Sequence, residues 1–285
     1  MNLGETMVYD KVYFIGTGKV GSECLKILSA HMDVKKLSCL SVEVDFVPII
    51  KKQCERLNIK NVILSQKELY DYMLSIAEKV LVISAHNQYI FPKAIVAKEN
   101  ITIINFHNAY LPEYRGRNAP TWEIFNQEEH GGATWHLVDA SVDTGNIIVQ
   151  EKVFIDARDT ALSLLMKCAL SGIKLFKNNV DNFLNETYQI MPKVQPGRLY
   201  YSKELPNDGY LDIYWTYDKV CRFLRAMDYK GMDIIPLPLI ELEGCVYNIE
   251  NYIFEDVCPP PHGYMCVKFP YKKTTRTVYL HLTLR

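Results

Sequence analysis

Two short apolar runs, Val80–Ser84 (VLVIS) and Ile101–Phe106 (ITIINF), determine the fold class expected for this chain. Both are rich in β-branched residues and nearly free of polar positions, which is typical of parallel strands buried on both faces. Upstream, strand-like stretches at Lys11–Ile15 and Lys36–Val44 alternate with helical spacing at Phe46–Leu57. Strands that alternate with helices predict βαβ units. We therefore expect an α/β fold with a doubly wound, mostly parallel sheet.

The hydrophobic pattern changes after Gly132. Two strand-like runs, Ala133–Asp139 and Asn146–Phe154, lie close together and are separated by turn residues. A long helix is expected to follow and to end near Asn185, with Asp159 as its N-cap because a short acceptor side chain favours that position. This region therefore extends the sheet with a hairpin-like pair before the last helix of the first domain.

A second, smaller domain is expected at the C-terminus. The string MPKVQPGR, residues 191–198, contains two prolines and a glycine and is typical of a chain leaving a domain. We therefore divide the chain into residues 1–197 and 198–285. The smaller domain is predicted to be β-rich, with one helix at Tyr217–Met227. Its strands are expected near residues 249–255, 265–269 and 278–284.

The composition excludes several classes of protein. The 285 residues carry 32 Lys and Arg against 33 Asp and Glu, and a net charge of −1 argues against nucleic acid as the main partner. Hydrophobic residues make up 48% of the chain, which excludes a disordered one. The eight cysteines form no CxxC pair, so neither a metal site nor a disulfide framework is expected.

The sequence also predicts the cellular location. The N-terminal residues lack the basic and apolar pattern of a signal peptide, and no apolar run approaches the roughly 18 residues that a membrane span needs. We therefore expect a cytoplasmic protein with no membrane partner.

A glycine motif, GTGKVG at Gly16–Gly21, follows the first predicted strand. Such a turn allows backbone N–H groups at a helix N-terminus to approach a phosphate, and Glu43 or Asp45 is spaced to hold a ribose. One interpretation is therefore an NAD-binding oxidoreductase. The other is that the glycines only permit a tight strand-to-helix turn, and the rest of the sequence favours this second interpretation.

The densest group of polar residues is NFHNAYLPEYRGRNAPTW, residues 105–122, which begins where the ITIINF strand ends. Ligands of open α/β sheets bind at the carboxyl ends of strands. Asn105 and His107 are two residues apart, so both side chains of a continuing strand point the same way. They combine an amide donor with a base suited to neutral pH. The prolines and glycine after them predict a rigid surface loop with no helix.

A second polar string, WHLVDASVDTGNII at residues 135–148, places Asp143 in a turn. An Asp beside Gly in a turn often serves the turn alone. Together with an Asn-x-His strand end, Asp143 can instead orient the histidine or a bound water.

These separated strings resemble the folate-dependent formyltransferases, and the sugar N-formyltransferases most closely. The resemblance is carried by Asn105-x-His107, by Leu111-Pro112-Glu113-Tyr114-Arg115-Gly116, and by His136 followed by Asp143-Thr144-Gly145-Asn146-Ile147. It covers roughly residues 12–154. It implies a Rossmann-like domain, formyl transfer from N10-formyltetrahydrofolate to a primary amine, and Asn105, His107 and Asp143 as the catalytic trio.

The resemblance also implies binding residues. The segment VLVISAHNQYIFPKAIV at 80–96 is similar to the part of the family that lines the folate pocket. The expected folate-binding residues are His86, Asn87, Gln88, Tyr89, Ile90, Val138 and Asp139. The expected substrate-binding residues are Tyr110, Arg115, Gly116, Arg117 and Asn118. No metal is implied.

The chemistry assigns roles to the trio. Attack of an amine on a formyl carbon produces an oxyanion and releases a proton, so one donor and one proton acceptor must lie near one point. We expect Asn105 to donate to the oxyanion. His107 would stabilise the same oxyanion or accept the amine proton, while Asp143 would orient His107 and take up that proton.

The amine acceptor is the least determined part of the function. The Arg-Gly-x-x-Pro-x-x-Trp form of residues 115–122 is similar to that of enzymes acting on nucleotide-linked amino-dideoxy sugars of surface polysaccharides. Arg115, Arg117 and Lys193 are candidates for a UDP or dTDP diphosphate. A methionyl-tRNA formyltransferase-like activity and a carrier-bound amine stay open as alternatives, as does an NAD-binding oxidoreductase. A homodimer is a further expectation.

Overall fold

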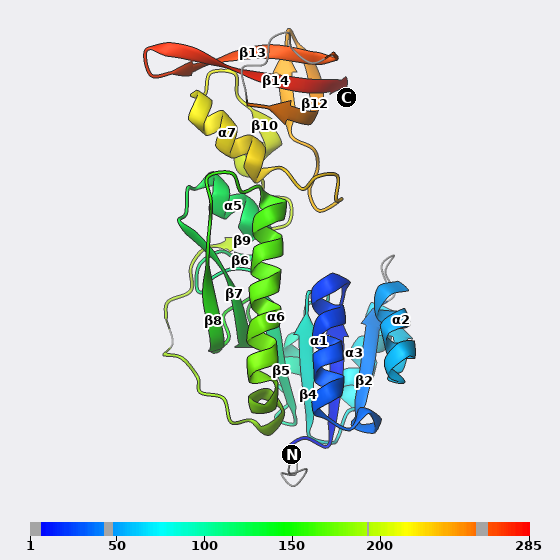
Figure 1. The fold of residues 1–285 in the computed structure, drawn as a ribbon. Helices are drawn as coiled ribbons and strands as arrows, with labels where there is room; N and C mark the ends of the chain where they lie inside the picture. Colours follow the sequence, from blue (N-terminus) through cyan, green and yellow to red (C-terminus); the bar gives the residue numbers. More distant parts are fainter. Residues whose placement is uncertain (1–6, 43–47, 193, 255–261) are drawn as a thin grey trace. The chain divides into compact units, whose positions relative to one another are not determined.

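The computed structural model describes residues 7–42, 48–192, 194–254 and 262–285 (Figure 1). Its internal contacts divide the chain into two units. The first comprises residues 1–115, 132–153 and 168–199, and the second comprises 116–131, 154–167 and 200–285. Our division at residues 197 and 198 separates the two large sheets, and the contacts add two earlier segments to the second unit.

The first unit contains a seven-stranded sheet in the order β3-β2-β1-β4-β5-β7-β8. Its strands are β1 (Lys11–Gly16), β2 (Leu37–Val42), β3 (Lys60–Leu64), β4 (Val80–Ala85), β5 (Ile101–His107), β7 (His130–Leu137) and β8 (Ile147–Phe154). The first five pair in parallel, whereas β5 and β7 are antiparallel. The prediction of an α/β fold with a mostly parallel sheet is therefore confirmed.

Helices cover both faces of this sheet (Figure 1). One face packs against α1 (Gly18–His31), α2 (Pro48–Leu57) and α6 (Ala161–Asn185), and the other packs against α3 (Gln66–Ser75) and α4 (Lys93–Val96). Alternate residues of β1 explain the two layers, because Phe14 belongs to the first core and Tyr13 to the second. Burial on both faces accounts for the uninterrupted apolar runs in the sequence.

The glycine motif has a packing role. A Cβ atom on Gly16 would lie 2.5 Å from the carbonyl oxygen of Ala85, and one on Gly21 would lie 2.9 Å from the carbonyl carbon of Gly16. Both glycines therefore allow α1 to approach β1 and β4 closely. This geometry gives the tight-turn interpretation a physical cause. Glu43 and Asp45, which the dinucleotide interpretation requires, lie outside the described residues.

The second unit contains a five-stranded sheet in the order β10-β11-β12-β14-β13. Its strands are β10 (Tyr210–Leu211), β11 (Leu239–Leu242), β12 (Cys245–Ile253), β13 (Tyr264–Tyr271) and β14 (Thr274–Leu284). The helix α7 (Tyr217–Ala226) shares a core with this sheet through Phe223, Phe269 and Leu280.

A two-stranded ladder joins β6 (Arg115–Gly116) and β9 (Leu199–Tyr200). Short 3-10 helices occupy Val34–Lys36 and Pro206–Gly209.

Two local predictions were wrong. Residues 119–122, expected in a loop, begin the helix α5 (Ala119–Phe125), because Asn118 in the left-handed region (φ 60°) starts it and Pro120 fits the first turn. The predicted cap Asp159 lies one residue too early. Thr160 and Ser163 instead exchange hydrogen bonds between backbone N–H and side-chain hydroxyl at the start of α6.

Candidate functional site

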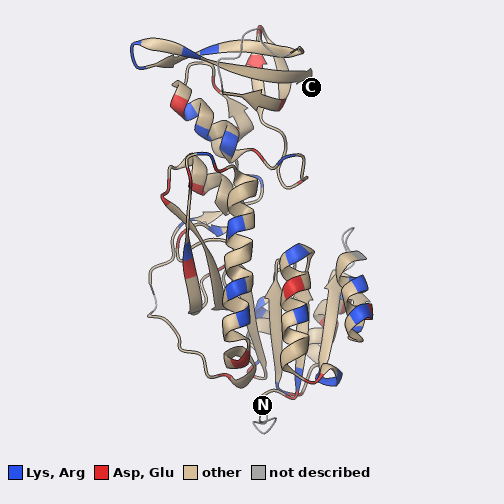
Figure 2. Cartoon of the chain, in the orientation of Figure 1, with Lys and Arg blue, Asp and Glu red and all other residues tan. Residues whose placement is uncertain are grey.

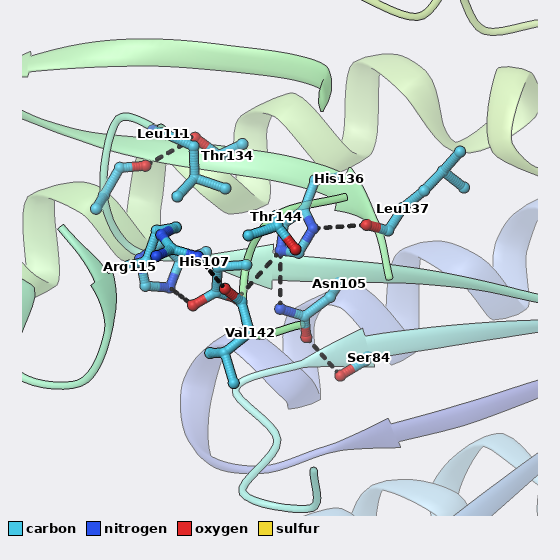
Figure 3. A network of polar contacts seen from close by, with 12 residues as sticks. Ser84, Asn105, His107, Leu111, Arg115, Thr134, His136, Leu137, Val142 and Thr144 are labelled. Atoms are coloured by element: carbon cyan, nitrogen blue, oxygen red, sulfur yellow. Dashed lines mark hydrogen bonds and ion pairs between the residues drawn. The ribbon is translucent and has the colours of Figure 1, made fainter. Parts of the chain in front are cut away.

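Asn105 and His107 lie in one polar region of the first unit (Figure 3), and Asp143 contacts both His107 and His136 there. Asn105 and His107 project from the carboxyl end of β5, two residues apart, as the alternation of a strand requires. Asp143 belongs to the loop between β7 and β8. The structure therefore brings together the three side chains that sequence analysis selected, although 36 residues of chain separate the last two.

The orientation of Asn105 is fixed from two sides (Figure 3). Ser84 Oγ donates to Asn105 Oδ1 at 2.7 Å, and Asn105 Nδ2 is 3.2 Å from His136 Nε2. His136 Nδ1 is 2.8 Å from the carbonyl oxygen of Leu137, so Nδ1 carries the proton and Nε2 accepts from Asn105. This chain of contacts leaves the second N–H of the Asn105 amide for a ligand.

His107 is held between two oxygens. Its Nε2 lies 2.9 Å from the carbonyl oxygen of Tyr114, and its Nδ1 lies 3.4 Å from Asp143 Oδ2. The second carboxylate oxygen of Asp143 lies 3.4 Å from His136 Nε2. Side chains of His107 and Asp143 are only 6% and 11% exposed. Asp143 is therefore a mostly buried carboxylate that faces one nitrogen of each of two imidazoles.

The loop that carries Asp143 has a defined shape. Asp143 adopts the left-handed region with φ 51°, and a Cβ atom on Gly145 would overlap the carbonyl oxygen of Leu137. The Asp139 carboxylate accepts from Ser141 N–H at 3.2 Å and from Thr144 Oγ1 at 2.5 Å. The Asp139 side chain, which we assigned to the folate site, thus holds the turn that presents Asp143.

The remaining candidates for the folate site follow β4 and β7, the two strands that flank β5 in the sheet. Residues 86–90 follow β4, which pairs with β5, and Val138 follows β7 and bonds through its N–H to Ile103 O. The His86 ring packs on Phe106, and Asn87 makes both its hydrogen bonds with the backbone of Tyr89. Burial raises the pKa of Tyr89. Ile90 is 68% exposed, an unusual position for a large apolar side chain, and Gln88 is also exposed.

Among the candidates for the acceptor site, Arg115, Arg117 and Asn118 make hydrogen bonds within their own units. Tyr110 and Arg115 belong to the first, where the Arg115 guanidinium donates from Nε to Gly197 O and from Nη1 to Val142 O. Gly116, Arg117 and Asn118 belong to the second. There the Arg117 N–H donates to Tyr200 O, and Asn118 Nδ2 donates to Ser202 O. Lys193 lies outside the described residues.

Two contributors were not among the site residues expected from the sequence: Ser84, and His136, which entered only as part of the family motif. Both lie opposite Asn105 in the sheet: Ser84 pairs with it in β4, and His136 pairs with it in β7. A polar residue at the end of the otherwise apolar run VLVIS was the available signal for Ser84. No comparable signal existed for the register that brings His136 to Asn105, because β5 and β7 are antiparallel and far apart in the chain.

The described residues contain neither a metal-binding cluster nor a membrane-spanning helix. Over residues 7–42, 48–192, 194–254 and 262–285, no group of three or more His, Cys, Asp or Glu side chains is arranged to hold a metal ion. None of the helices in those ranges has the length and hydropathy of a membrane span. Basic and acidic residues are interspersed in both units (Figure 2).

Comparisons with known proteins identify the family of this chain. The family model described as formyl transferase matches residues 24–179. A GDP-perosamine N-formyltransferase of Brucella melitensis biotype 1 is 25% identical over 246 residues, which cover 79% of this chain and 89% of the relative. A methionyl-tRNA formyltransferase of Thermodesulfovibrio yellowstonii is 33% identical over 119 residues, which cover only 42% of this chain and 38% of the relative.

Solved structures share the fold over nearly the whole chain. WlaRD, a sugar 3N-formyl transferase crystallised with dTDP and 5-N-formyl-THF, superposes with a TM-score of 0.73 at 20% identity and covers 98% of both chains. An N-formyltransferase from Helicobacter canadensis, in complex with folinic acid and dTDP-3-aminofucose, gives a TM-score of 0.73 at 18% identity, covering 96% of this chain and 99% of that one.

Proposed function

Because the chain belongs to the formyl transferase family, we propose that it transfers a formyl group from N10-formyltetrahydrofolate to the primary amine of a nucleotide-linked amino sugar. The observation that carries this proposal is the network of Asn105, His107 and Asp143 at the end of β5. It supplies an amide donor and a buried imidazole–carboxylate pair within one site, which are the two functions that acyl transfer to an amine requires.

The reaction conserves atoms and charge. The amine lone pair attacks the formyl carbon, the bond from that carbon to N10 of the folate breaks, and N10 ends with one proton in exchange for the formyl group. The amine loses one proton in forming the amide. The site therefore has to stabilise one transient oxyanion and relay one proton.

Asn105 is assigned to the oxyanion. Its Oδ1 accepts from Ser84 and one N–H of Nδ2 is directed to His136, so the amide is held in a single orientation before substrate arrives. Donors that are already oriented stabilise a developing charge without a further reorganisation cost. The second N–H of Nδ2 is the donor for the oxyanion.

The His107–Asp143 pair is assigned to the proton. With Nε2 donating to Tyr114 O, the neutral ring has an unprotonated Nδ1 that faces Asp143 Oδ2 at 3.4 Å. A proton taken from the amine is then shared between Nδ1 and the carboxylate, which act as one coupled unit. Asp143 also stabilises the imidazolium that forms.

The folate is assigned to residues 86–90 and to Val138 and Asp139, which follow β4 and β7 on either side of β5. The structures of WlaRD and of the Helicobacter canadensis enzyme were obtained with a formylated folate, which supports this co-substrate. For the acceptor, Arg117, Gly116 and Asn118 are the candidates in the second unit, and Tyr110 is the candidate in the first. The sugar-nucleotide class follows from relatives that match most of this chain.

The test is a panel of GDP-, dTDP- and UDP-linked amino sugars incubated with N10-formyltetrahydrofolate. Mass spectrometry should detect the gain of one formyl group on at least one sugar, and no gain with the Asn105→Ala protein. Formylation of methionyl-tRNA or of a carrier-bound amine in place of every sugar would overturn the substrate class.

Folate binding has a separate readout. N10-formyltetrahydrofolate at about 100 times its dissociation constant should stabilise the native protein by about 2.7 kcal/mol, detectable as a rise in Tm. NAD should give no rise, and a rise with NAD alone would favour the oxidoreductase.

A further inference from the structure

Two consecutive residues, Tyr114 and Arg115, contact His107 and the residue that precedes Asp143. The carbonyl oxygen of Tyr114 accepts from His107 Nε2 at 2.9 Å. The next side chain, Arg115, donates from Nη1 to the carbonyl oxygen of Val142 at 3.2 Å (Figure 3). Val142 directly precedes Asp143. One short segment therefore holds the ring of His107 by its backbone and the loop of Asp143 by a side chain.

The contact of Arg115 reaches the peptide that orients Asp143. The Val142 carbonyl belongs to the peptide unit that ends at the nitrogen of Asp143, a residue in the left-handed region at φ 51°. A non-glycine residue in that region costs roughly 1–2 kcal/mol and persists only where the surroundings fix it. The Asp139 carboxylate, through Ser141 and Thr144, and the close packing of Gly145 also restrain this loop. Arg115 supplies a restraint immediately before Asp143.

The same guanidinium also holds a second segment. Its Nε donates to Gly197 O at 2.9 Å, and the Gly197 N–H donates to Pro112 O at 3.0 Å. A Cβ atom on Gly197 would lie 2.6 Å from Glu113 Oε2, so the segment packs closely on residues 112–113. A pocket beside the trio is lined by Leu111, Pro112, residues 143–147, Pro192, Val194 and Pro196. Arg115 therefore bonds to the residue that follows Pro196 and to the residue that precedes Asp143, and Pro196 and Asp143 both line this pocket.

We propose, on the basis of the formyl-transfer function given above, that Arg115 is a positioning residue that holds Asp143 against His107 and does not bind the diphosphate of the acceptor. Two of its five N–H donors bond to backbone carbonyls in the first unit. A planar guanidinium can reach two such acceptors at fixed angles, which an ammonium cannot. The neighbouring Arg117 donates its backbone N–H to Tyr200 O and stays the candidate cation for the diphosphate.

The first experiment compares Arg115→Met and Arg115→Lys with Arg56→Met, an exposed arginine on α2, as the matched control. If Arg115 positions Asp143, Arg115→Met lowers kcat by about 10²-fold, the typical loss for a reacting group displaced by 1 Å. The KM for the nucleotide sugar stays near that of the wild type, and the pH dependence of kcat changes. Arg115→Lys recovers part of kcat because an ammonium can reach one carbonyl.

The opposite kinetic result overturns the proposal. A diphosphate ligand would raise the KM for the nucleotide sugar in both variants and leave kcat and its pH profile unchanged. Unchanged kcat and KM in Arg115→Met, or equal losses in Arg56→Met, would also overturn it.

A second measurement needs no acceptor and separates this proposal from the proposed function. Nitrogen-15 NMR of the imidazoles in the protein without substrate reports the tautomer and titration of His107. Arg115→Met should alter the His107 signals, while Arg56→Met leaves them as in the wild type. If no acceptor is formylated but His107 responds in this way, the function is wrong and the positioning role stands. Unaltered His107 signals in Arg115→Met and Arg115→Lys contradict the role, whatever the acceptor.

Discussion

The Nδ1 atom of His107 lies 3.4 Å from Oδ2 of Asp143, while the other ring nitrogen donates to the carbonyl oxygen of Tyr114. A carbonyl oxygen can only accept, so the proton of the neutral ring belongs to Nε2. Nδ1 and the carboxylate are then both acceptors, and a hydrogen bond between them requires one more proton. The resting pair is therefore arranged to receive the proton that an attacking amine loses.

Asp143→Asn tests this relationship. The amide has the shape of the carboxylate but neither takes up a proton nor balances an imidazolium, so kcat should fall by about 10²–10⁴-fold, the range for a positioned acid or base. Steady-state kinetics measures kcat, and the folate-dependent rise in Tm shows that the site is still folded. Asp181→Asn is the matched control because Asp181 pairs with His31 at the surface. Wild-type turnover in Asp143→Asn would contradict the assignment.

Asn105→Ala tests the oxyanion donor. Loss of one such donor typically costs about 10²–10³-fold in kcat. The fold should be retained, because Asn105 belongs to neither hydrophobic core of the first unit, and circular dichroism of the whole protein checks this. The reference variant is Asn179→Ala on α6, whose amide donates to Leu175 O and accepts from Asn182 within the same helix. A loss confined to KM would mean that Asn105 binds substrate without stabilising the transition state.

Ser84→Ala tests whether the amide orientation matters. The variant removes the hydroxyl that donates to Asn105 Oδ1 at 2.7 Å. A hydrogen bond of this kind contributes about 1 kcal/mol, so we expect kcat to fall by up to about tenfold. Ser29→Ala, which removes an exposed hydroxyl on α1, should leave kcat unchanged. Equal rates in both variants would show that the Asn105 amide does not need Ser84.

Gly145→Ala tests the shape of the catalytic loop. A Cβ atom there would overlap Leu137 O, so the loop must move away from β7 and carry Asp143 with it. We expect loss of most turnover together with a lower Tm. Gly18→Ala provides the contrast, because a Cβ at Gly18 meets nothing within 4 Å although its φ is +61°. It should lose a little stability and retain activity, and loss of folate-dependent turnover in Gly18→Ala would restore the glycine motif as a functional site.

Glu123→Gln tests a buried carboxyl of the second unit. Glu123 is 1% exposed, its Oε2 has no hydrogen-bond partner among the described residues, and burial raises its pKa well above the usual value, with Glu128 adding to the rise. The folded protein therefore keeps a proton that the unfolded chain loses above about pH 4.3. Unfolding then releases a proton, so the free energy of unfolding falls as pH rises from there toward the folded-state pKa.

The glutamine variant has no such proton to lose. Urea unfolding at acidic and neutral pH measures the free energy of unfolding of both proteins. That free energy should depend less on pH in Glu123→Gln than in the wild type. Relative to the wild type, the variant should therefore be more stable at neutral pH. Glu99→Gln, at an exposed position, should keep the wild-type pH dependence. A steeper fall in stability with pH in Glu123→Gln would contradict a protonated Glu123.

The sequence by itself determined the layers of the first unit and half of its site. Runs such as Val80–Ser84 can be buried only between two helical layers, and the two-residue spacing of Asn105 and His107 places both side chains on one side of β5. These are local properties, because strand alternation and apolar continuity depend on neighbours in the chain.

Only the tertiary structure decided the other half. The antiparallel register of β5 and β7 sets His136 opposite Asn105, and the loop geometry returns Asp143 to His107. The helix α5 was missed for a related reason, since its start depends on a left-handed Asn118 that no apolar pattern reveals. Register and loop closure are set by packing between distant segments. The contacts that Ser84, His136 and Arg115 make in the site are therefore found only in the folded protein.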